Sequence, residues 1–402
     1  MISASLGYTV EELVARGAQH TAREIFQQPA LWREVGGAVV DRRARTEAFL
    51  RPLLDRDDLR IVLTGAGTSA FAGDVLAPAL RRELHRRVDA VSTTEIVSSP
   101  LECFAEDRPT LLISFARSGD SPESVAATEL ADQCLREVYH LVVTCNSAGE
   151  LFRRHTHADR SLVLLMPELS DDQGFAMTGS FTCMTLATWL TLAGTARDDM
   201  LAERLAVAAE RILATQGPAV RALAEGRYER IVYLGSGPLR GLARESALKL
   251  LELTAGGVVS YSDSALGFRH GPKAVLDDST LAIVFLSNDP YTRQYDLDIT
   301  DELRRALGTT SVVTISAGGI AGLADGDPWQ VEGLDDVSDA ALALPFAVSA
   351  QLLGLQFSLT LGNTPDNPFP SGAVNRVVQG VTIHALPASA PLPSPTPSPA
   401  SA

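Results

Sequence analysis

One pattern recurs in this chain at a fixed spacing of 170 residues, and this recurrence limits the folds that the chain can adopt. Three short apolar runs of the first half reappear in the second half. The pairs are RIVLTGAG (60–67) with RIVYLGSG (230–237), TLLISF (110–115) with TLAIVF (280–285), and VVT (142–144) with VVT (312–314). Three runs in register at one spacing indicate a tandem duplication. Since helical stretches separate the runs, we expect two α/β units, each with a parallel sheet between helices.

The length of 402 residues leaves room for segments outside the two units. The first fifty residues have a helical pattern with an expected interruption at Gln28-Pro29, and a link between the copies is expected around residues 217–226. The chain ends in Ala-Ser-Pro repeats, whose composition predicts disorder. The expected division is a helical segment (1–50), a first α/β domain (51–215), a second α/β domain (216–385) and a disordered tail (386–402).

The acidic balance of the chain, a net charge of −15, argues against binding to nucleic acids and to anionic membrane surfaces. We expect no signal peptide and no membrane span, since no run of about 18 apolar residues is found. The cysteines are not spaced as metal ligands, so free thiols in a reducing cytoplasm are expected. They are Cys103, Cys134, Cys145 and Cys183.

Two loops of the first copy have the composition of anion-binding loops. GAGTS (65–69) follows an apolar strand and opens a helix, although it matches the nucleotide fingerprint G-x-G-x-x-G only loosely. ARSGDSP (116–122) follows the next apolar strand, and its Arg117 favours a phosphate ligand. Ser121 before Pro122 is also good helix-capping chemistry, and the two interpretations can hold together.

The second copy carries its charged residues on one helix and in the loop that follows. Residues 245–255 contain no Gly or Pro and predict a helix, with Glu245, Lys249 and Glu252 in one stripe on an otherwise apolar surface. A buried helix must direct such a stripe to a partner, to water or to a polar cavity. The following loop includes His270, and carboxylates with a histidine are groups of acid–base catalysis. The alternative is a solvated stripe and a basic surface loop.

Several strings, taken together, resemble the sugar isomerase (SIS) domain family over about residues 21–384. They are GAGTS (65–69), SGDS (118–121), RESALKLLEL (244–253) and FRHGP (268–272). The ordered set HTAREI, SFARSGDSPESVAA, GFAMTGSFTCM, GFRHGPK, DPYTRQYDLD and PDNPFPSG is similar to the tagatose-6-phosphate ketose/aldose isomerase branch, also described as galactosamine-6-phosphate deaminase/isomerase. The resemblance implies an α/β fold of two tandem SIS units, each with a five-stranded parallel sheet of the flavodoxin or Rossmann type.

The resemblance also implies roles for individual residues. In the related glucosamine-6-phosphate synthases the first copy holds the sugar phosphate. The residues implied for substrate or phosphate binding here are Gly67, Thr68, Ser69, Arg117, Ser118, Ser121 and Arg376, and those implied for catalysis are Glu252, Lys249 and His270. Ala116 stands where those relatives begin the phosphate loop with serine, so one hydroxyl contact is absent. The C-terminal lysine of the synthases has no clear equivalent, and Arg376 or Gln379 lies near its place.

The implied activity is the conversion of an amino-hexose 6-phosphate, galactosamine 6-phosphate in particular, to tagatose 6-phosphate and ammonia. Glu252 is the expected base at C2 with Lys249 beside it, and His270, supplied by another subunit, is expected to open the sugar ring. No cofactor or metal is expected, whereas a homodimer or larger homo-oligomer is. Glu245 is either a structural partner of Lys249 or an acid of the site.

Three alternatives to the deaminase remain at this point. The first is an aldose–ketose isomerase that releases no ammonia. The second is an ammonia-transferring synthase, which would need a glutaminase domain ahead of the region described by the resemblance. The third is a sugar-phosphate sensor, for which the N-terminal segment lacks the basic recognition helix of a DNA-binding domain.

Overall fold

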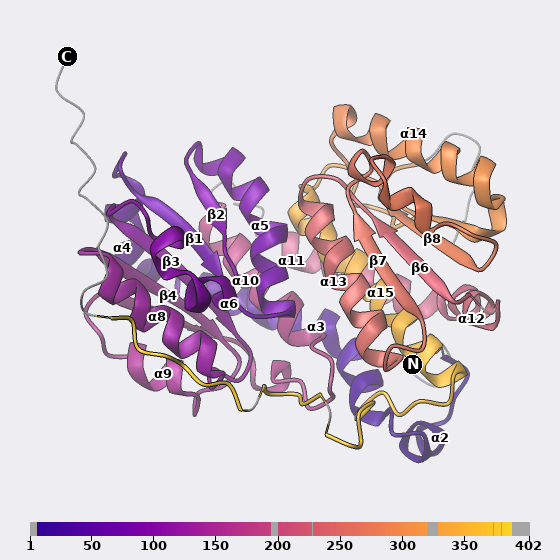
Figure 1. Ribbon diagram of the computed structural model, residues 1–402, viewed down its shortest axis with the longest axis horizontal. Coiled ribbons are helices and arrows are strands. Elements are labelled where there is room, and N and C mark those ends of the chain that lie inside the picture. Colours follow the sequence, from indigo (N-terminus) through magenta and orange to yellow (C-terminus); the bar gives the residue numbers. More distant parts are fainter. Residues whose placement is uncertain are drawn as a thin grey trace.

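The computed structural model describes residues 6–193, 200–226, 228–319, 329–372, 374–378 and 380–387. Within these ranges the chain forms two parallel β-sheets with helices around them, one sheet for each sequence copy (Figure 1). Neighbouring parallel strands require crossover connections, and helices supply them. The predicted α/β fold class is confirmed.

The first sheet has the strand order β2-β1-β3-β4-β5, and all of its strands run parallel. Its strands are β1 (Arg60–Thr64), β2 (Val88–Ala90), β3 (Thr110–Ala116), β4 (Val138–Thr144) and β5 (Ser161–Leu165). Alternate residues of β3 pack into different layers: Leu111 and Ile113 join the large core, whereas Leu112 packs with Ile96 and Leu130 on the other face. Burial on both faces explains why the strands read as continuous apolar runs.

The second sheet has the order β7-β6-β8-β9 and is also parallel. Its strands are β6 (Arg230–Leu234), β7 (Val259–Asp263), β8 (Thr280–Phe285) and β9 (Val312–Ile315). We expected five strands, but the described ranges contain four, and beyond β9 only an isolated bridge joins Ser316 to Gln330. β7 falls in a stretch for which the sequence predicts a loop, because an edge strand reading VSYSD has little apolar content.

The remaining elements complete the two layers of helices around each sheet. In the first unit these are α5 (Thr68–Leu84), α6 (Thr93–Ser98), α7 (Pro100–Cys103), α8 (Pro122–Cys134), α9 (Glu150–His155), the 3-10 turn η1 (Glu168–Ser170) and α10 (Gly179–Leu192). In the second unit they are α13 (Pro238–Leu253), η2 (Gly267–Arg269), η3 (Pro272–Val275), α14 (Pro290–Leu307), η4 (Thr309–Ser311) and α15 (Asp339–Thr360).

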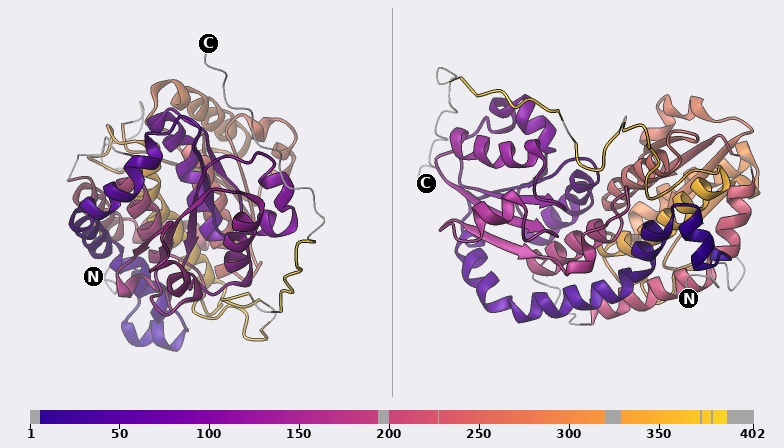
Figure 2. Two further views of the ribbon diagram at one scale, coloured as in Figure 1. Left: turned by 90° about the vertical axis from the view of Figure 1, so that its left-hand side faces the viewer. Right: turned by 90° about the horizontal axis from the view of Figure 1, so that it is seen from below.

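The N-terminal helices α2 (Val10–Ala15), α3 (Gln19–Asp41) and α4 (Arg43–Leu54) precede the first sheet. α3 runs beneath both units and packs on α10, α11 and α15 (Figure 2). The predicted interruption at Gln28-Pro29 is wrong, because α3 continues through Pro29. Proline leaves the carbonyl four residues earlier without its helical donor. Here the Gln28 side-chain amide donates to the Ile25 carbonyl oxygen instead, at 3.1 Å.

The expected link between the copies is itself helical. α11 (Leu201–Thr215) leads into α12 (Gly217–Glu225), whose first turn carries a proline, a residue that suits that position. After α15 the C-terminal strap (residues 361–372, 374–378 and 380–387) runs back from the second unit to the first (Figure 1). Leu386 packs against the apolar cluster on the outer face of the first sheet. The predicted disordered tail otherwise lies outside the described residues.

The two units meet through α13, which packs on α5 of the first unit and on α15 of its own. Gly241 of α13 allows the closest approach, since a Cβ atom there would lie 2.6 Å from the backbone nitrogen of Val75. α15 is the one described helix long and apolar enough to span a membrane, and all of its residues except the last, Thr360, are buried in the molecule. It contacts helices of both units and of the N-terminal segment, so it forms the centre of the shared core.

We predict that Gly241→Ala lowers the free energy of unfolding by about 1–3 kcal/mol, because the added methyl group forces α13 away from α5. Gly37→Ala is the matched control, since Gly37 is an exposed residue inside α3 with no atom within 4 Å of the added Cβ. That change should raise stability by about 0.5–1 kcal/mol. Urea midpoints of the two variants measure both effects, and equal midpoints would contradict the close packing.

Candidate active site

The charged stripe of α13 is buried against the first unit. Glu245 and Lys249 are each 1% exposed, and Glu252 at the last turn of the helix is half-buried. The solvated-stripe alternative is therefore wrong. Glu245 interacts with the side chain of Thr68, the first residue of α5, so the stripe lies near the carboxyl end of β1, where the loops after parallel strands form ligand sites.

Lys249 lies between the two carboxylates of its own helix. Its Nζ is 3.5 Å from Glu245 Oε1 and donates a hydrogen bond to Glu252 Oε2. Burial alone would lower the pKa of Lys249, but the carboxylates of Glu245 and Glu252 outweigh it and raise that pKa above its usual value. Lys249 is thus held in its charged form. Its close partner is Glu252, whose partly exposed carboxylate is open to the site on one side.

Glu245 is the least satisfied group of the three. Neither of its buried oxygens has a hydrogen bond of good geometry to any residue in the described ranges. Burial raises the pKa of Glu245 to about 8, although the Lys249 charge and the Thr68 side chain pull it down. The Thr68 contact links the first turn of α5 to the middle of α13, so the two sequence copies meet at this carboxyl group.

The GAGTS loop makes a sharp turn between β1 and α5. Gly67 is the N-cap residue of α5, with a φ of 54°, and Gly237 takes the same place before α13 with a φ of 55°. The positive φ explains the glycine in both copies. The predicted ligand Ser69 is buried, and its hydroxyl lies 3.9 Å from the sulfur of Met177.

The second predicted loop lies between β3 and α8. Ser121 is the N-cap residue of α8, but its hydroxyl makes no capping bond and donates to Ser124 Oγ at 2.6 Å. The Ser118 carbonyl oxygen accepts from the Asn146 side chain at 2.9 Å, and the Ser118 hydroxyl accepts from the Asp120 backbone N–H at 3.3 Å. These bonds fix a loop whose backbone N–H groups stand at a helix N-terminus, where an anion is favoured.

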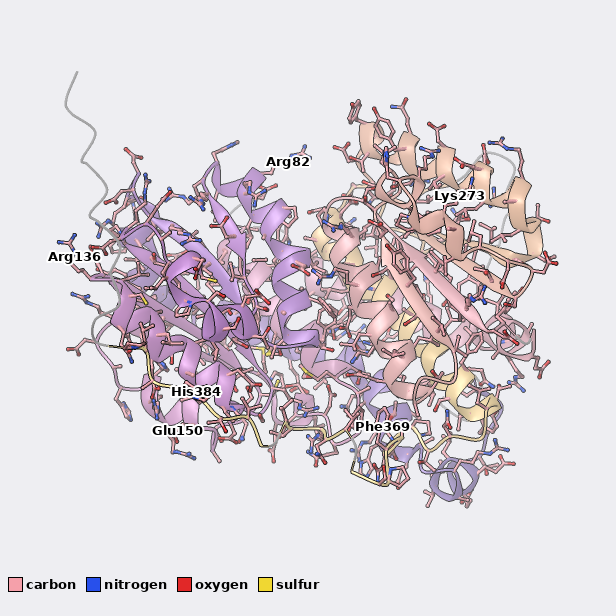
Figure 3. The ribbon with its side chains drawn as sticks, in the orientation of Figure 1. Arg82, Arg136, Glu150, Lys273, Phe369 and His384 are labelled. Atoms are coloured by element: carbon pink, nitrogen blue, oxygen red, sulfur yellow. The ribbon has the colours of Figure 1, made fainter. Side chains whose placement is uncertain are left out.

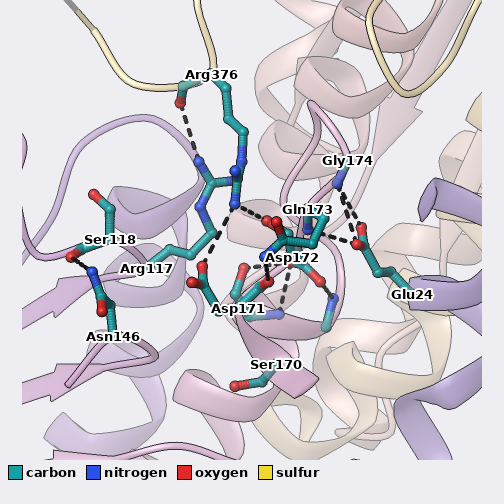
Figure 4. A network of polar contacts seen from close by, with 12 residues as sticks. Glu24, Arg117, Ser118, Asn146, Ser170, Asp171, Asp172, Gln173, Gly174 and Arg376 are labelled. Carbon is teal, nitrogen blue, oxygen red and sulfur yellow. Dashed lines mark hydrogen bonds and ion pairs between the residues drawn. The ribbon is translucent and has the colours of Figure 1, made fainter. Parts of the chain in front are cut away.

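Two arginines from distant parts of the chain meet beside this loop (Figure 4). Arg117 is 6% exposed, and its Nη2 donates to the Arg376 carbonyl oxygen at 3.2 Å. Its Nε and Nη1 are buried and make no hydrogen bond within the described residues. Burial and the nearby Arg376 charge lower the pKa of Arg117. Such a pair of cations with free donors is suited to a dianionic ligand.

The structure brings further residues to the site for which the sequence predicts no role. Arg376 donates to the Asp172 carbonyl oxygen and lies 3.6 Å from the Asp171 carboxylate, and Glu24 of α3 contacts the same segment. Glu24 lies in the HTAREI string and the two aspartates just precede GFAMTGSFTCM, strings used above only as marks of the family. Gln379, the alternative to Arg376, lies outside the described residues.

His270 lies on the other side of the second sheet from α13. Its neighbour Phe268 packs with Val232, on the sheet face that α14 covers, whereas Ile231 points into the core shared with α13. His270 is exposed, and the adjoining Lys273 lies near α14 (Figure 3). The structure therefore does not bring His270 to Glu252 within one chain.

No group of three or more His, Cys, Asp or Glu side chains arranged to hold a metal occurs in the described part of the chain. The donors that converge on the site are instead cationic or backbone groups around one buried carboxylate–lysine–carboxylate stripe. This set can bind an anion and transfer protons between carbon atoms held near it.

We predict that Glu245→Gln changes how stability depends on pH. Between about pH 5 and pH 8 the folded chain keeps the Glu245 proton that the unfolded chain has lost, so stability falls as pH rises. Because the variant lacks this titration, its free energy of unfolding should rise relative to that of the wild type as pH increases across this range, by at most about 1.4 kcal/mol per pH unit. Denaturant midpoints at pH 5, 6, 7 and 8 measure the difference, and parallel curves would contradict it.

Comparison with known proteins shows which family the chain belongs to. The SIS domain family model matches residues 53–194 and 227–324, which are the two sheet-bearing units. The chain is 63% identical over 372 residues to "Putative D-galactosamine-6-phosphate deaminase AgaS" of Streptomyces coelicolor, covering 92% of this chain and 96% of that one. It is 46% identical to "D-galactosamine-6-phosphate deaminase AgaS" of Escherichia coli, covering 90% and 95%.

Among solved structures, the chain is similar to the tagatose-6-phosphate ketose/aldose isomerase of Escherichia coli, with a TM-score of 0.81 and 43% sequence identity. That similarity covers 91% of this chain and 96% of the other. The two sequence relatives and this structure each match nine-tenths or more of the chain. The chain belongs to the SIS domain family, in the group whose members carry these deaminase and isomerase names.

Proposed function

We propose that this protein is a deaminating isomerase that converts D-galactosamine 6-phosphate to tagatose 6-phosphate and ammonia. The observation that carries the proposal is the buried stripe of Glu245, Lys249 and Glu252 beside a cationic anion-binding loop. The names of the relatives at 63% and 46% identity support the choice of substrate.

The phosphate group is proposed to lie on the loop between β3 and α8. Backbone N–H groups at the start of α8 and the hydroxyls of Ser118 and Ser121 supply donors, and α5 begins nearby at Thr68. Arg117 and Arg376 supply two positive charges. The Arg117 charge is one of the influences that lower the pKa of Lys249, which supports a position of this loop near α13.

Glu252 is proposed as the base that moves the C2 proton. In the open-chain sugar Glu252 takes the proton from C2, which gives an enolamine, and returns a proton to C1, which leaves an imine at C2. Water adds to the imine carbon, and ammonia leaves as the ketone forms. Lys249, hydrogen-bonded to Glu252, stabilises negative charge that develops on the substrate oxygen at C1.

Ring opening requires a proton donor, and within the described residues of one chain the expected donor, His270, lies away from Glu252. We propose that His270 of a second subunit supplies it, since His270 is exposed and lies on the sheet face remote from α13. Arg269 and Lys273 on either side of it bind Glu302 of α14, so the loop is held in a defined position for such a contact. The active unit is then a homodimer or a larger homo-oligomer.

Two alternative functions, an isomerase without deamination and a sugar-phosphate sensor, can be distinguished from the proposed one. An isomerase without deamination would release no ammonia from the amino sugar. A sugar-phosphate sensor would bind without turnover, yet a binding site alone gives no reason to bury Lys249 and Glu245 of α13, because burying charged side chains is unfavourable. The cytoplasm is the proposed location, and the four free cysteines support it.

We predict that Glu252→Gln lowers kcat for ammonia release about 10²–10⁴-fold and abolishes exchange of the C2 proton with solvent. KM should change little, because Glu252 acts on the proton rather than on the phosphate. The measurement is ammonia production together with deuterium incorporation from heavy water. Glu225→Gln, an exposed change at the end of α12, is the control. Wild-type exchange in the Glu252 variant would contradict the assignment.

We also predict that two inactive variants restore activity when their subunits exchange. In a dimer with one His270→Ala chain and one Glu252→Gln chain, one of the two sites has both groups intact. Random pairing should recover roughly a quarter of the wild-type activity. The mixture is assayed after partial unfolding and refolding, with each variant refolded alone as the control. A mixture no more active than its parts would show that His270 does not act across subunits.

A further inference from the structure

The segment 171–174 of the first unit is held from two sides by buried carboxylates (Figure 4). On one side Glu24 of α3, 1% exposed, accepts from the Gln173 backbone N–H at 2.6 Å and from the Gly174 backbone N–H at 3.1 Å. A Cβ atom on Gly174 would lie 2.9 Å from the Thr21 hydroxyl, so α3 lies directly against the segment.

On the other side the Asp172 side chain is used to begin α10. Its oxygens accept from the backbone N–H groups of Thr178 at 2.7 Å, Gly179 at 3.2 Å and Ser180 at 2.9 Å. The Asp172 side chain is thus occupied, and its backbone carbonyl oxygen is the group presented to the Arg376 guanidinium. The orientation of this carbonyl follows from the two sets of bonds that fix residues 172–174.

Arg376 and Arg117 depend on that orientation. Arg376 is held by the Asp172 carbonyl oxygen and the nearby Asp171 carboxylate, and the Arg376 carbonyl oxygen in turn accepts from Arg117. Two guanidinium groups kept this close repel each other unless an anion lies between or beside them. Two nitrogens of Arg117 are buried without a partner among the described residues, next to the proposed phosphate loop.

Resting on the proposed function, we propose that Glu24 is a positioning residue for phosphate binding, which acts through residues 171–174 to set Arg376 and, through it, Arg117. Glu24 lies on the N-terminal helix and does not itself reach the sugar phosphate. Three separate parts of the chain, α3, the first unit and the C-terminal strap, are thereby joined at the anion site.

The burial of Glu24 is unfavourable by itself, which argues that its carboxyl group has a role beyond packing. Burial and the neighbouring Asp172 charge raise the pKa of Glu24 to about 7, although the Arg23 guanidinium, 3.7 Å from its carboxylate, lowers that pKa. Gln28 shows how the same helix uses a neutral buried group. It donates to the Gln351 side chain at 2.7 Å and accepts from the Thr182 hydroxyl, and its hydrogen bonds go to residues other than 171–174.

The test compares Glu24→Gln with Gln28→Met, a buried change on the same helix that leaves the segment 171–174 untouched. Glu24→Gln places an amide group against the Gln173 and Gly174 N–H groups, so we expect KM for galactosamine 6-phosphate to rise about tenfold with kcat within about twofold. The dissociation constant of inorganic phosphate, measured by calorimetry, should rise by a similar factor. Gln28→Met should lower the melting temperature and leave both constants unchanged.

A double variant shows whether Glu24 acts through Arg376. If it does, Glu24→Gln combined with Arg376→Ala binds phosphate no more weakly than Arg376→Ala alone. If the two changes raise the dissociation constant of phosphate by factors that multiply, the proposal is overturned. It is also overturned if Glu24→Gln lowers only the thermal stability, or if the wild type binds no phosphate. Because the phosphate measurement needs no turnover, a chain that binds phosphate in this way without releasing ammonia would overturn the proposed function and leave the role of Glu24 standing.

Discussion

The direct packing of α13 on α5 is the contact on which the rest of the structure depends. The two helices occupy equivalent places in the duplicated pattern, each following the first central strand of its sheet after a glycine with the same positive φ. Asp74 of α5 and Arg244 of α13 are separated by the repeat distance of 170 residues, and they form an ion pair with each other. Equivalent residues meet in this way across an approximate twofold axis. The duplication therefore supplied both the units and the surface that joins them.

The two copies differ in what fills their anion-binding loops. In the first copy the loop after β3 is flanked by Arg376 and by Arg117, whose buried Nε and Nη1 have no partner among the described residues. In the second copy the Asp339 carboxylate accepts from the Asn288 backbone N–H at 2.7 Å and from the Ser287 hydroxyl. Ser287 and Asn288 are the equivalents of Arg117 and Ser118. An internal carboxylate thus stands where the first copy is proposed to hold a phosphate, so one loop is part of the core and the other is left for a ligand.

The repeat predicted most of the fold because parallel strands buried on both faces must be apolar throughout. Strands without that burial were missed: β2 has three residues and β7 is a polar edge strand. The continuity of α3 through Pro29 was also missed, since it depends on a side-chain bond from Gln28 that composition does not reveal.

Part of the candidate site could be predicted and part could not. The stripe on α13 follows from helical periodicity, and the loops beside Gly67 and Ser118 follow from strand–turn–helix patterns. The contacts of Glu24 and Arg376 join positions more than 140 residues apart, which no local pattern reports. The position of His270 behind the second sheet depends on which face of that sheet the loop after β7 covers.

The burial of α15 has a consequence for how the chain reaches its native state. This helix is the last one in the described chain, yet it is the centre of the core and contacts α3, α5, α10, α11, α12 and α13. During synthesis every one of those helices is made before the segment that completes their packing. Until that segment arrives, the apolar faces that cover it are exposed and prone to aggregate. A chain that stops short of α15 would lack a centre for both units, so the two halves gain stability together rather than in turn.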